Sequence, residues 1–160
     1  MKKKVLLSLM VFVFLGPPGS GKGTLANKIS THFKLPHIST GDLLRRECQA
    51  NSPLGQQAKD LIDAGKLVPD ALIMEMLQAR LSEPDCSNGC IIDGVPRTLA
   101  QAKLLDQIVP PTSQTLINMN LDSEIILERL SSRRVCPSCS KGYNLVSSPP
   151  QVSDTCDDCQ

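Results

Sequence analysis

GPPGSGKGT, at residues 16–24, follows directly on an apolar run at residues 5–15. A buried strand that ends in a glycine-rich turn and continues into a helix lets backbone N–H groups surround an anion at the positive end of the helix. Lys22 adds a full positive charge at the same place. The stretch therefore predicts a phosphate-binding loop that joins a strand to a helix, and an ordinary Gly/Pro turn is the alternative interpretation.

The loop departs by one position from the common phosphate-loop pattern. The pattern G-x-x-x-x-G-K-[ST] is met from Gly16 to Lys22, but Gly23 stands where a metal-binding hydroxyl is expected, and Thr24 follows it. This variant resembles the loop of nucleoside monophosphate kinases, in which the phosphates themselves hold much of the metal.

The composition fits one globular domain with a small insert. The chain has 160 residues, 41% of them apolar, and its 17 basic and 16 acidic residues leave a net charge of +1. This balance indicates no broad basic face, and an aromatic content of 2% leaves few stacking platforms for bases. We therefore expect neither nucleic acid nor a membrane as a partner. We also expect a monomer.

The N-terminus imitates a secretory signal, because three lysines at positions 2–4 precede the apolar run. No small-residue cleavage site follows, and the run is shorter than the roughly 20 residues of a membrane-spanning helix. Cleavage would also remove the strand that leads into the loop. We interpret the run as a central parallel strand that is buried on both faces.

Apolar runs alternate with helical patterns along the chain, which predicts an α/β fold with a doubly wound parallel sheet of the P-loop NTPase type. We expect strands at residues 5–15, 36–39, 90–93 and 115–121, and helices at 22–32, 40–49, 53–64, 69–81, 98–108 and 122–134. Three successive helices between the second and third strands exceed one ordinary crossover. We therefore expect a helical insert at 40–68, a core at 1–39 and 69–134, and a further small segment at 135–160.

Polar side chains follow the second and third strands. Thr40 offers a hydroxyl at a helix entry and Arg45 a forked contact with phosphate, although a capped surface helix also explains this segment taken alone. Asp93 ends the third strand at the sheet edge that faces a ligand, where it can orient the water shell of Mg²⁺. Arg97 can then reach an acceptor phosphate, and Gln101 can pair with the edge of a base.

The chain resembles adenylate kinases. The matching sequence motifs occur in the same order as in the family: GPPGSGKGT at 16–24, STGDLLR at 39–45, DAGKLVPD at 63–70, DGVPRT at 93–98 and LERLSSRR at 127–134. The resemblance implies phosphoryl transfer from ATP to AMP with Mg²⁺, giving two ADP. Leu25 and Val95 depart from the family's usual glutamine and phenylalanine. A UMP/CMP kinase or a guanylate kinase is the second interpretation within enzymes.

The resemblance also implies roles for individual residues. The implied ATP-binding residues are Gly19, Ser20, Gly21, Lys22, Gly23, Thr24, Arg133, Gly142 and Tyr143. The implied AMP-binding residues are Thr40, Arg45, Gly65, Lys66, Leu67, Val68, Gly94, Val95, Pro96, Arg97 and Gln101. The implied catalytic residues are Lys22, Asp93, Arg97, Arg129 and Arg133. Phosphoryl transfer needs such positive charge more than acid–base groups, and we interpret His32 and His37 as surface or core residues without spaced partners.

Four of the seven cysteines form two C-x-x-C pairs, Cys136 with Cys139 and Cys156 with Cys159, separated by 16 residues. This spacing predicts a tetrahedral Cys₄ zinc site without an open position, which makes the metal structural, and two disulfides are the alternative. A short pair of C-x-x-C knuckles beside a nucleotide site favours zinc and the reducing cytoplasm. In the resembled family this segment is the lid that closes over ATP, and some members carry zinc there.

The sequence given stops at Gln160, whereas members of the resembled family continue. We therefore expect a C-terminally truncated member, without the return of the lid, a further sheet strand and the closing helices. Such a chain is expected to transfer phosphate poorly or not at all. A non-catalytic nucleotide-binding short form and a zinc-knuckle interaction module are the other interpretations.

Overall fold

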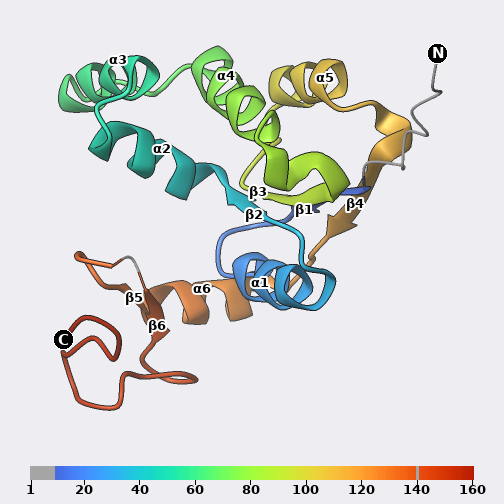
Figure 1. The fold of residues 1–160 in the computed structure, drawn as a ribbon. Helices are drawn as coiled ribbons and strands as arrows, with labels where there is room; N and C mark the ends of the chain where they lie inside the picture. Colours follow the sequence, from blue (N-terminus) through green and yellow to red (C-terminus); the bar gives the residue numbers. More distant parts are fainter. Residues whose placement is uncertain (1–9, 140) are drawn as a thin grey trace, which may run out of the picture. The chain divides into compact units, whose positions relative to one another are not determined.

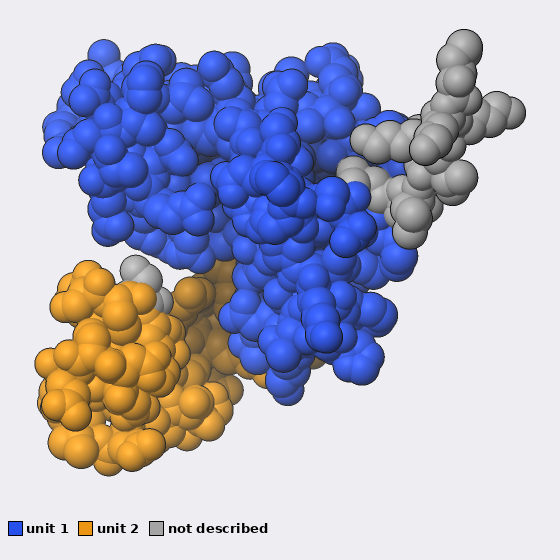
Figure 2. All heavy atoms as spheres, in the orientation of Figure 1, with its two compact units in different colours: residues 1–16, 21–119 blue, residues 17–20, 120–160 orange. Residues whose placement is uncertain are grey.

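The computed structural model describes residues 10–139 and 141–160. The chain divides into two compact units, coloured separately in Figure 2. Unit 1 comprises residues 1–16 and 21–119, and unit 2 comprises residues 17–20 and 120–160. Among the described residues, none of the helices combines the length and the apolar character that crossing a membrane requires.

A four-stranded parallel sheet forms the centre of unit 1 (Figure 1). In spatial order its strands are β2 (His37–Ser39), β3 (Gly89–Asp93), β1 (Met10–Leu15) and β4 (Gln114–Asn118). The neighbouring pairs are all parallel, which confirms the predicted doubly wound α/β fold. The first residues of the strand predicted at 5–15 lie outside the described part of the chain, and β4 ends at Asn118 rather than at position 121.

The central strand β1 is buried on both faces, as its continuous apolar character predicts. Val11 and Val13 belong to one hydrophobic cluster, which includes residues of α4 (Asp70–Leu81) and α5 (Leu99–Ile108). Phe14 belongs to a second cluster with Ala26 of α1 (Lys22–Phe33) and Ile91. Figure 1 shows α1 on the opposite side of the sheet from α4 and α5. Alternate residues of one strand therefore fill two cores, although Met10 at its start is exposed.

The segment between β2 and α4 contains α2 (Thr40–Gln49) and α3 (Pro53–Asp63). Ser52 caps α3 by accepting a hydrogen bond from the Gly55 N–H at 3.0 Å, and Pro53 occupies the first helical turn. A Cβ atom on Gly55 would overlap the carbonyl group of Glu47 in α2. The two helices therefore pack more closely than any larger residue at position 55 allows.

Gly65 ends α3 as the sequence predicts. Its φ of 68° is left-handed, and the N–H groups of Gly65 and Lys66 donate to the carbonyls of Ile62 and Leu61 at 2.9 and 2.8 Å. This is the paired arrangement of a Schellman motif, which satisfies the last carbonyls of the helix. The next helix, α4, begins at Asp70 with Pro69 as its N-cap, one residue later than predicted.

Unit 2 contains α6 (Ser123–Ser131), β5 (Arg133–Val135) and β6 (Gly142–Asn144). The prediction of one helix across 122–134 is wrong at its end, because residues 133–135 pair with 142–144 as an antiparallel ladder. Asn144 reinforces the change of direction by donating from Nδ2 to the Ser132 hydroxyl at 2.8 Å. Arg133 consequently lies on a strand and not on the helix that carries Arg129.

Short 3₁₀ turns precede strands β3 and β4 of the sheet. The first, η1, spans Pro84–Asn88 before β3, and the second, η2, spans Pro111–Ser113 before β4. Both begin with proline, which suits a first turn because it has no N–H to satisfy. The sequence analysis did not predict them, because such turns leave no periodic pattern.

Candidate functional site

Within the loop at residues 16–24, the Lys22 side chain reaches back to the first residue of the loop. The Lys22 Nζ atom donates to the Gly16 carbonyl at 2.8 Å. Gly21 is the N-cap of α1 with a φ of 92°, and it brings no side-chain acceptor to the first N–H groups of the helix. A helix start that lacks a side-chain cap retains the N–H groups that bind an anion.

Asp93 ends β3 beside the loop. A Cβ atom on Gly23 would lie 3.6 Å from Asp93 Oδ2, an ordinary contact distance, so the carboxylate is a direct neighbour of the loop. Mg²⁺ retains several waters, and a carboxylate is a group that can orient one of them. The donor chemistry at Asp93 therefore fits the predicted magnesium site.

His37 is a neighbour of Asp93 that the sequence analysis missed. Its Nε2 atom lies 3.8 Å from Asp93 Oδ2, and its Nδ1 atom lies 2.7 Å from Asn27 Oδ1. Within the described residues Nε2 is buried and has no hydrogen-bond partner. The contact depends on the parallel pairing of β2 with β3, and the position of His37 on a predicted strand is the signal that points to it.

The register of β2 and β3 also brings Thr40 to Gly94. Ser39 pairs with Asp93, so the residues that follow them leave the sheet side by side. The Thr40 hydroxyl donates to the Asp93 carbonyl at 3.4 Å and is 6% exposed. Gly94 has a φ of 99°, and a Cβ atom there would overlap Thr40 Oγ1. Two of the predicted AMP-site residues thus adjoin at the carboxyl edge of the sheet.

Arg97 and Gln101 extend this group. The Arg97 guanidinium donates from Nε to the Gly94 carbonyl at 2.6 Å, and the Arg97 N–H donates to Gln101 Oε1 at 2.7 Å. Gln101 is 5% exposed, and its Nε2 donates to Asp70 Oδ1 at 2.6 Å. The structure therefore brings together Thr40, Gly94, Arg97 and Gln101, and it adds Asp70, which was not predicted as a site residue.

The remaining predicted AMP-site residues differ in what they offer. Arg45 forms an ion pair with Asp42 one turn earlier on α2. The segment 65–68 connects α3 to α4, and Leu67 within it is 93% exposed. Val95 is 2% exposed and belongs to the hydrophobic core, so only its backbone can meet a ligand. These AMP-site assignments stay predictions.

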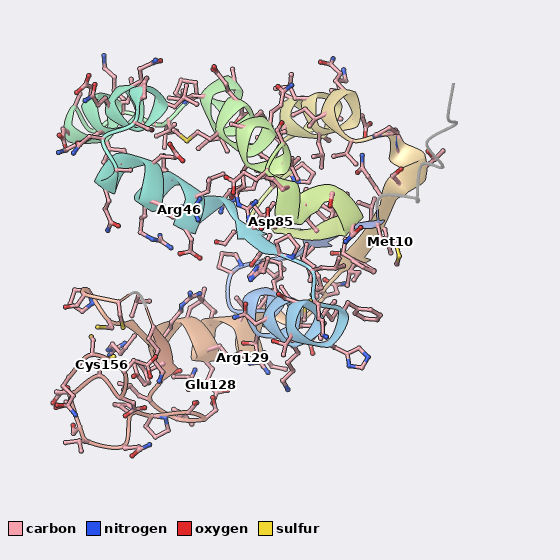
Figure 3. All side chains as sticks on the ribbon, viewed as in Figure 1. Met10, Arg46, Asp85, Glu128, Arg129 and Cys156 are labelled. Carbon is pink, nitrogen blue, oxygen red and sulfur yellow. The ribbon has the colours of Figure 1, made fainter. Side chains whose placement is uncertain are left out.

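Within unit 2, α6 lies against part of the loop. Arg129 of α6, labelled in Figure 3, donates from Nη1 to the Gly19 carbonyl at 3.3 Å. A Cβ atom on Gly19 would lie 3.4 Å from the Leu130 side chain. The hydroxyl of Ser20 is buried and has no hydrogen-bond partner among the described residues. Arg133 is exposed on β5.

The four predicted metal ligands come together in unit 2. Their sulfur atoms lie within 4.8 Å of one another, with Cys136 and Cys159 at 3.4 Å and Cys139 and Cys156 at 3.5 Å (Figure 3). A disulfide needs about 2.05 Å, whereas four sulfurs bound to one zinc ion at about 2.3 Å stand about 3.8 Å apart. All seven cysteines are unpaired. The arrangement fits a tetrahedral metal site better than two disulfides.

Tyr143 links β6 to this cysteine cluster. Its hydroxyl accepts from the Asp157 N–H at 2.8 Å and lies 3.3 Å from Cys156 Sγ. The hydrogen bond from Tyr143, together with backbone N–H groups of Cys159 and Asp158, lowers the pKa of the Cys156 thiol to about 6. Hydrogen bonds with the other three cysteines, Cys136 first, raise the pKa of Cys159 to about 12. Cys156 is therefore poised to be a thiolate, which is the form that binds metal.

Comparison with known proteins identifies the family. The adenylate kinase family model matches residues 14–159. An adenylate kinase of Methanocella arvoryzae is 46% identical over 153 residues, covering 94% of this chain and 71% of that protein. Adenylate kinases of Thermosipho melanesiensis and Thermotoga neapolitana are 46% and 45% identical over 94% and 92% of this chain, and 72% and 69% of their own lengths. The chain described here belongs to the adenylate kinase family.

Proposed function

We propose that this chain binds ATP and AMP and transfers the terminal phosphoryl group of ATP to AMP, giving two ADP. Family membership supports the reaction class. The observation that carries the proposal is the group formed by Thr40, Gly94, Arg97 and Gln101 at the carboxyl edge of the sheet, in the unit that also holds Lys22. Ligands of open α/β sheets bind at this edge.

The chemistry requires positive charge more than acid–base groups. A transferring phosphoryl group spreads negative charge over three equatorial oxygens, which cations stabilise. Lys22 would hold the outer phosphates of ATP, and Arg97 and Arg45 the phosphate of AMP. Arg129 and Arg133 would contact the transferring group. Arg45 has to exchange its present carboxylate partner, Asp42, for phosphate before it can do so.

Asp93 is the residue that we assign to the magnesium ion. The ion would neutralise phosphate charge, and Asp93 would orient waters of its hydration shell instead of replacing them. His37 would neighbour this carboxylate, with Nε2 3.8 Å from Asp93 Oδ2, and its ring is itself held by Asn27.

Zinc is the metal that we assign to the cysteine cluster, as a structural ion. Four thiolates leave no open position for a substrate, so Cys136, Cys139, Cys156 and Cys159 would stabilise the fold of residues 133–159 rather than react. The segment would form the lid over ATP, with Gly142 and Tyr143 near the nucleotide. Seven unpaired thiols suit a reducing compartment, which supports a location in the cytoplasm. For the oligomeric state we propose a monomer.

A coupled assay of ADP formation tests the reaction. Even where transfer is slow, we expect more ADP from ATP with AMP than with GMP, CMP or UMP, and we expect calorimetric titration to give separate binding of AMP and ATP. Binding of both nucleotides without ADP formation would reduce the proposal to a nucleotide-binding protein. Turnover of UMP or GMP in preference to AMP would contradict the assignment of the acceptor.

A further inference from the structure

The carboxylate of Asp70 joins the starts of two helices that are distant in sequence. Asp70 is the first residue of α4. Its Oδ2 atom accepts from the Thr98 hydroxyl at 2.8 Å, and its Oδ1 atom accepts from Gln101 Nε2 at 2.6 Å. These partners lie 28 and 31 residues farther along the chain, at the beginning of α5. Asp70 therefore uses both oxygens on the segment that carries Arg97 and Gln101.

The hydrogen bonds close into a ring through Gln101. The Gln101 N–H donates to the Thr98 hydroxyl at 3.1 Å, which caps α5. The Gln101 side chain also accepts from the Arg97 N–H at 2.7 Å. Both ends of the buried amide are thus held, one by a carboxylate and the other by a backbone N–H.

These two partners allow only one orientation of the amide. A carboxylate only accepts hydrogen bonds and a backbone N–H only donates them. Nε2 of Gln101 must therefore face Asp70 and Oε1 must face Arg97, because a flipped amide would set acceptor against acceptor and donor against donor. One N–H of Nε2 and one lone pair of Oε1 are left over by the ring.

A fixed order of donor and acceptor distinguishes purines. Adenine presents an amino donor beside a ring-nitrogen acceptor, whereas guanine presents a carbonyl acceptor beside a ring N–H donor. An amide that is free to flip can pair with either edge, and one that is locked can pair well with only one. A site built to hydrogen-bond one pattern rejects the other strongly, because the buried groups would stay unpaired.

We propose that Asp70 is a positioning residue that sets the base selectivity of the AMP site, by locking the Gln101 amide in the orientation that pairs with adenine. This inference rests on the proposed function, since it requires the AMP base to lie at Gln101. Asp70 acts through Gln101 and makes no contact with the nucleotide. It also stands two residues after the predicted AMP-site segment 65–68.

Asp70→Asn is the test, because asparagine has the same shape but offers one acceptor and one donor in place of two acceptors. The carboxylate that requires Nε2 to face position 70 is then gone, and the Arg97 N–H alone still favours the original orientation of the Gln101 amide, so the lock is weakened. We expect the ratio of the AMP affinity to the GMP affinity to fall about tenfold, which corresponds to about 1.4 kcal/mol. The ATP affinity should stay unchanged. The matched control is Glu75→Gln, which removes one negative charge from an exposed position of the same helix. Calorimetric titration of the full chain with AMP, GMP and ATP gives all three affinities.

The outcomes separate this inference from the proposed function. Equal affinities of the unaltered chain for AMP and GMP would contradict the adenine assignment and this inference together. A preference for AMP that survives in Asp70→Asn would contradict the role of Asp70 alone.

A second measurement needs no variant and decides the matter if Asp70→Asn does not fold. In the unaltered chain, solvent exchange of the Gln101 side-chain amide hydrogens, followed by NMR, should be slower than that of the exposed Gln57. Equal exchange at the two glutamines would show that the ring does not hold the amide and would overturn the proposal.

Discussion

Lys22 supplies the full charge of the loop at residues 16–24, and it rests 2.8 Å from the Gly16 carbonyl oxygen. We predict that Lys22→Ala weakens ATP binding by about 2–3 kcal/mol, the scale of a charge-assisted hydrogen bond to phosphate. Calorimetric titration with ATP measures the loss. Lys28→Ala, at an exposed position of the same helix, is the matched control and should bind ATP as the unaltered chain does. Equal affinity in Lys22→Ala would show that the loop does not hold the ATP phosphates.

Replacement of Gly94 should weaken the binding of AMP and leave the binding of ATP unchanged. Alanine at this position meets a φ of 99° and overlaps Thr40 Oγ1, so the turn before Arg97 must move. We predict that Gly94→Ala lowers AMP affinity by about 1–3 kcal/mol, the usual scale of local backbone strain, with ATP affinity unchanged. Gly142→Ala serves as the control for AMP binding, because a Cβ atom there has no neighbour within 4 Å and the position lies outside the predicted AMP site. Titrations with each nucleotide decide the matter, and a parallel loss of ATP binding would mean general unfolding instead.

The sequence identifies the residues that we assign to phosphate and metal binding, but it does not identify the residues that contact and position the site residues. Lys22, Arg97 and the four cysteines stand in local motifs whose spacing indicates their role. Asp70 and His37 stand in no motif, and their function depends on contacts with residues 31 and 56 positions away. Such contacts follow from strand order and helix docking, which local patterns do not encode.

At the level of helices and strands, local chemistry predicts the beginnings better than the ends. Ser39, Ser52 and Thr98 are N-cap residues whose hydroxyls accept hydrogen bonds from the first helical turn, and each stands where a predicted helix begins or just before it. The predicted helix at 122–134 was too long because residues 133–135 pair with a strand formed by 142–144. Helix propensity cannot show that pairing, because the partner strand lies on the other side of the first C-x-x-C pair.

The pair of helices α2 and α3 gives a prediction at this scale. Gly55→Ala would drive a methyl group into the backbone of Glu47, so the two helices must separate. We predict a loss of about 2 kcal/mol or more in the free energy of unfolding. Overpacking typically costs roughly 1–3 kcal/mol, and the loss is larger if the pair of helices cannot relax. Gly65→Ala is the matched control. It has a left-handed φ of 68° but no neighbour within 4 Å, so it should cost only about 1 kcal/mol. Urea unfolding compares the two variants, and an equal loss in both would contradict the close packing of α2 on α3.

At the scale of the whole molecule, the parallel sheet follows from the alternation of apolar runs and helices, but the strand order β2-β3-β1-β4 does not. Sheet order depends on which faces the crossover helices cover. The helix and strands of unit 2 have no comparable apolar core: within α6, β5 and β6 no residue is buried. The cysteine spacing is therefore the local signal that points to the fold of the segment after α6.

Metal removal should distinguish the stability of residues 133–159, which we expect to depend on zinc, from the stability of unit 1. We predict one equivalent of zinc in the purified chain, and chelation should unfold residues 133–159 while unit 1 keeps its structure, because unit 1 has its own hydrophobic clusters. Elemental analysis gives the stoichiometry, and hydrogen exchange with and without chelator locates the change. Absence of zinc, or loss of protection across the sheet as well, would contradict this assignment.

The pairing of Ser39 with Asp93 restricts where this chain can gain or lose residues in evolution. Deleting one residue from β2 or β3 would turn the rest of that strand to the opposite face and carry Thr40 away from Gly94. Length differences between this chain and its relatives should therefore fall outside the two short strands, which keep their length.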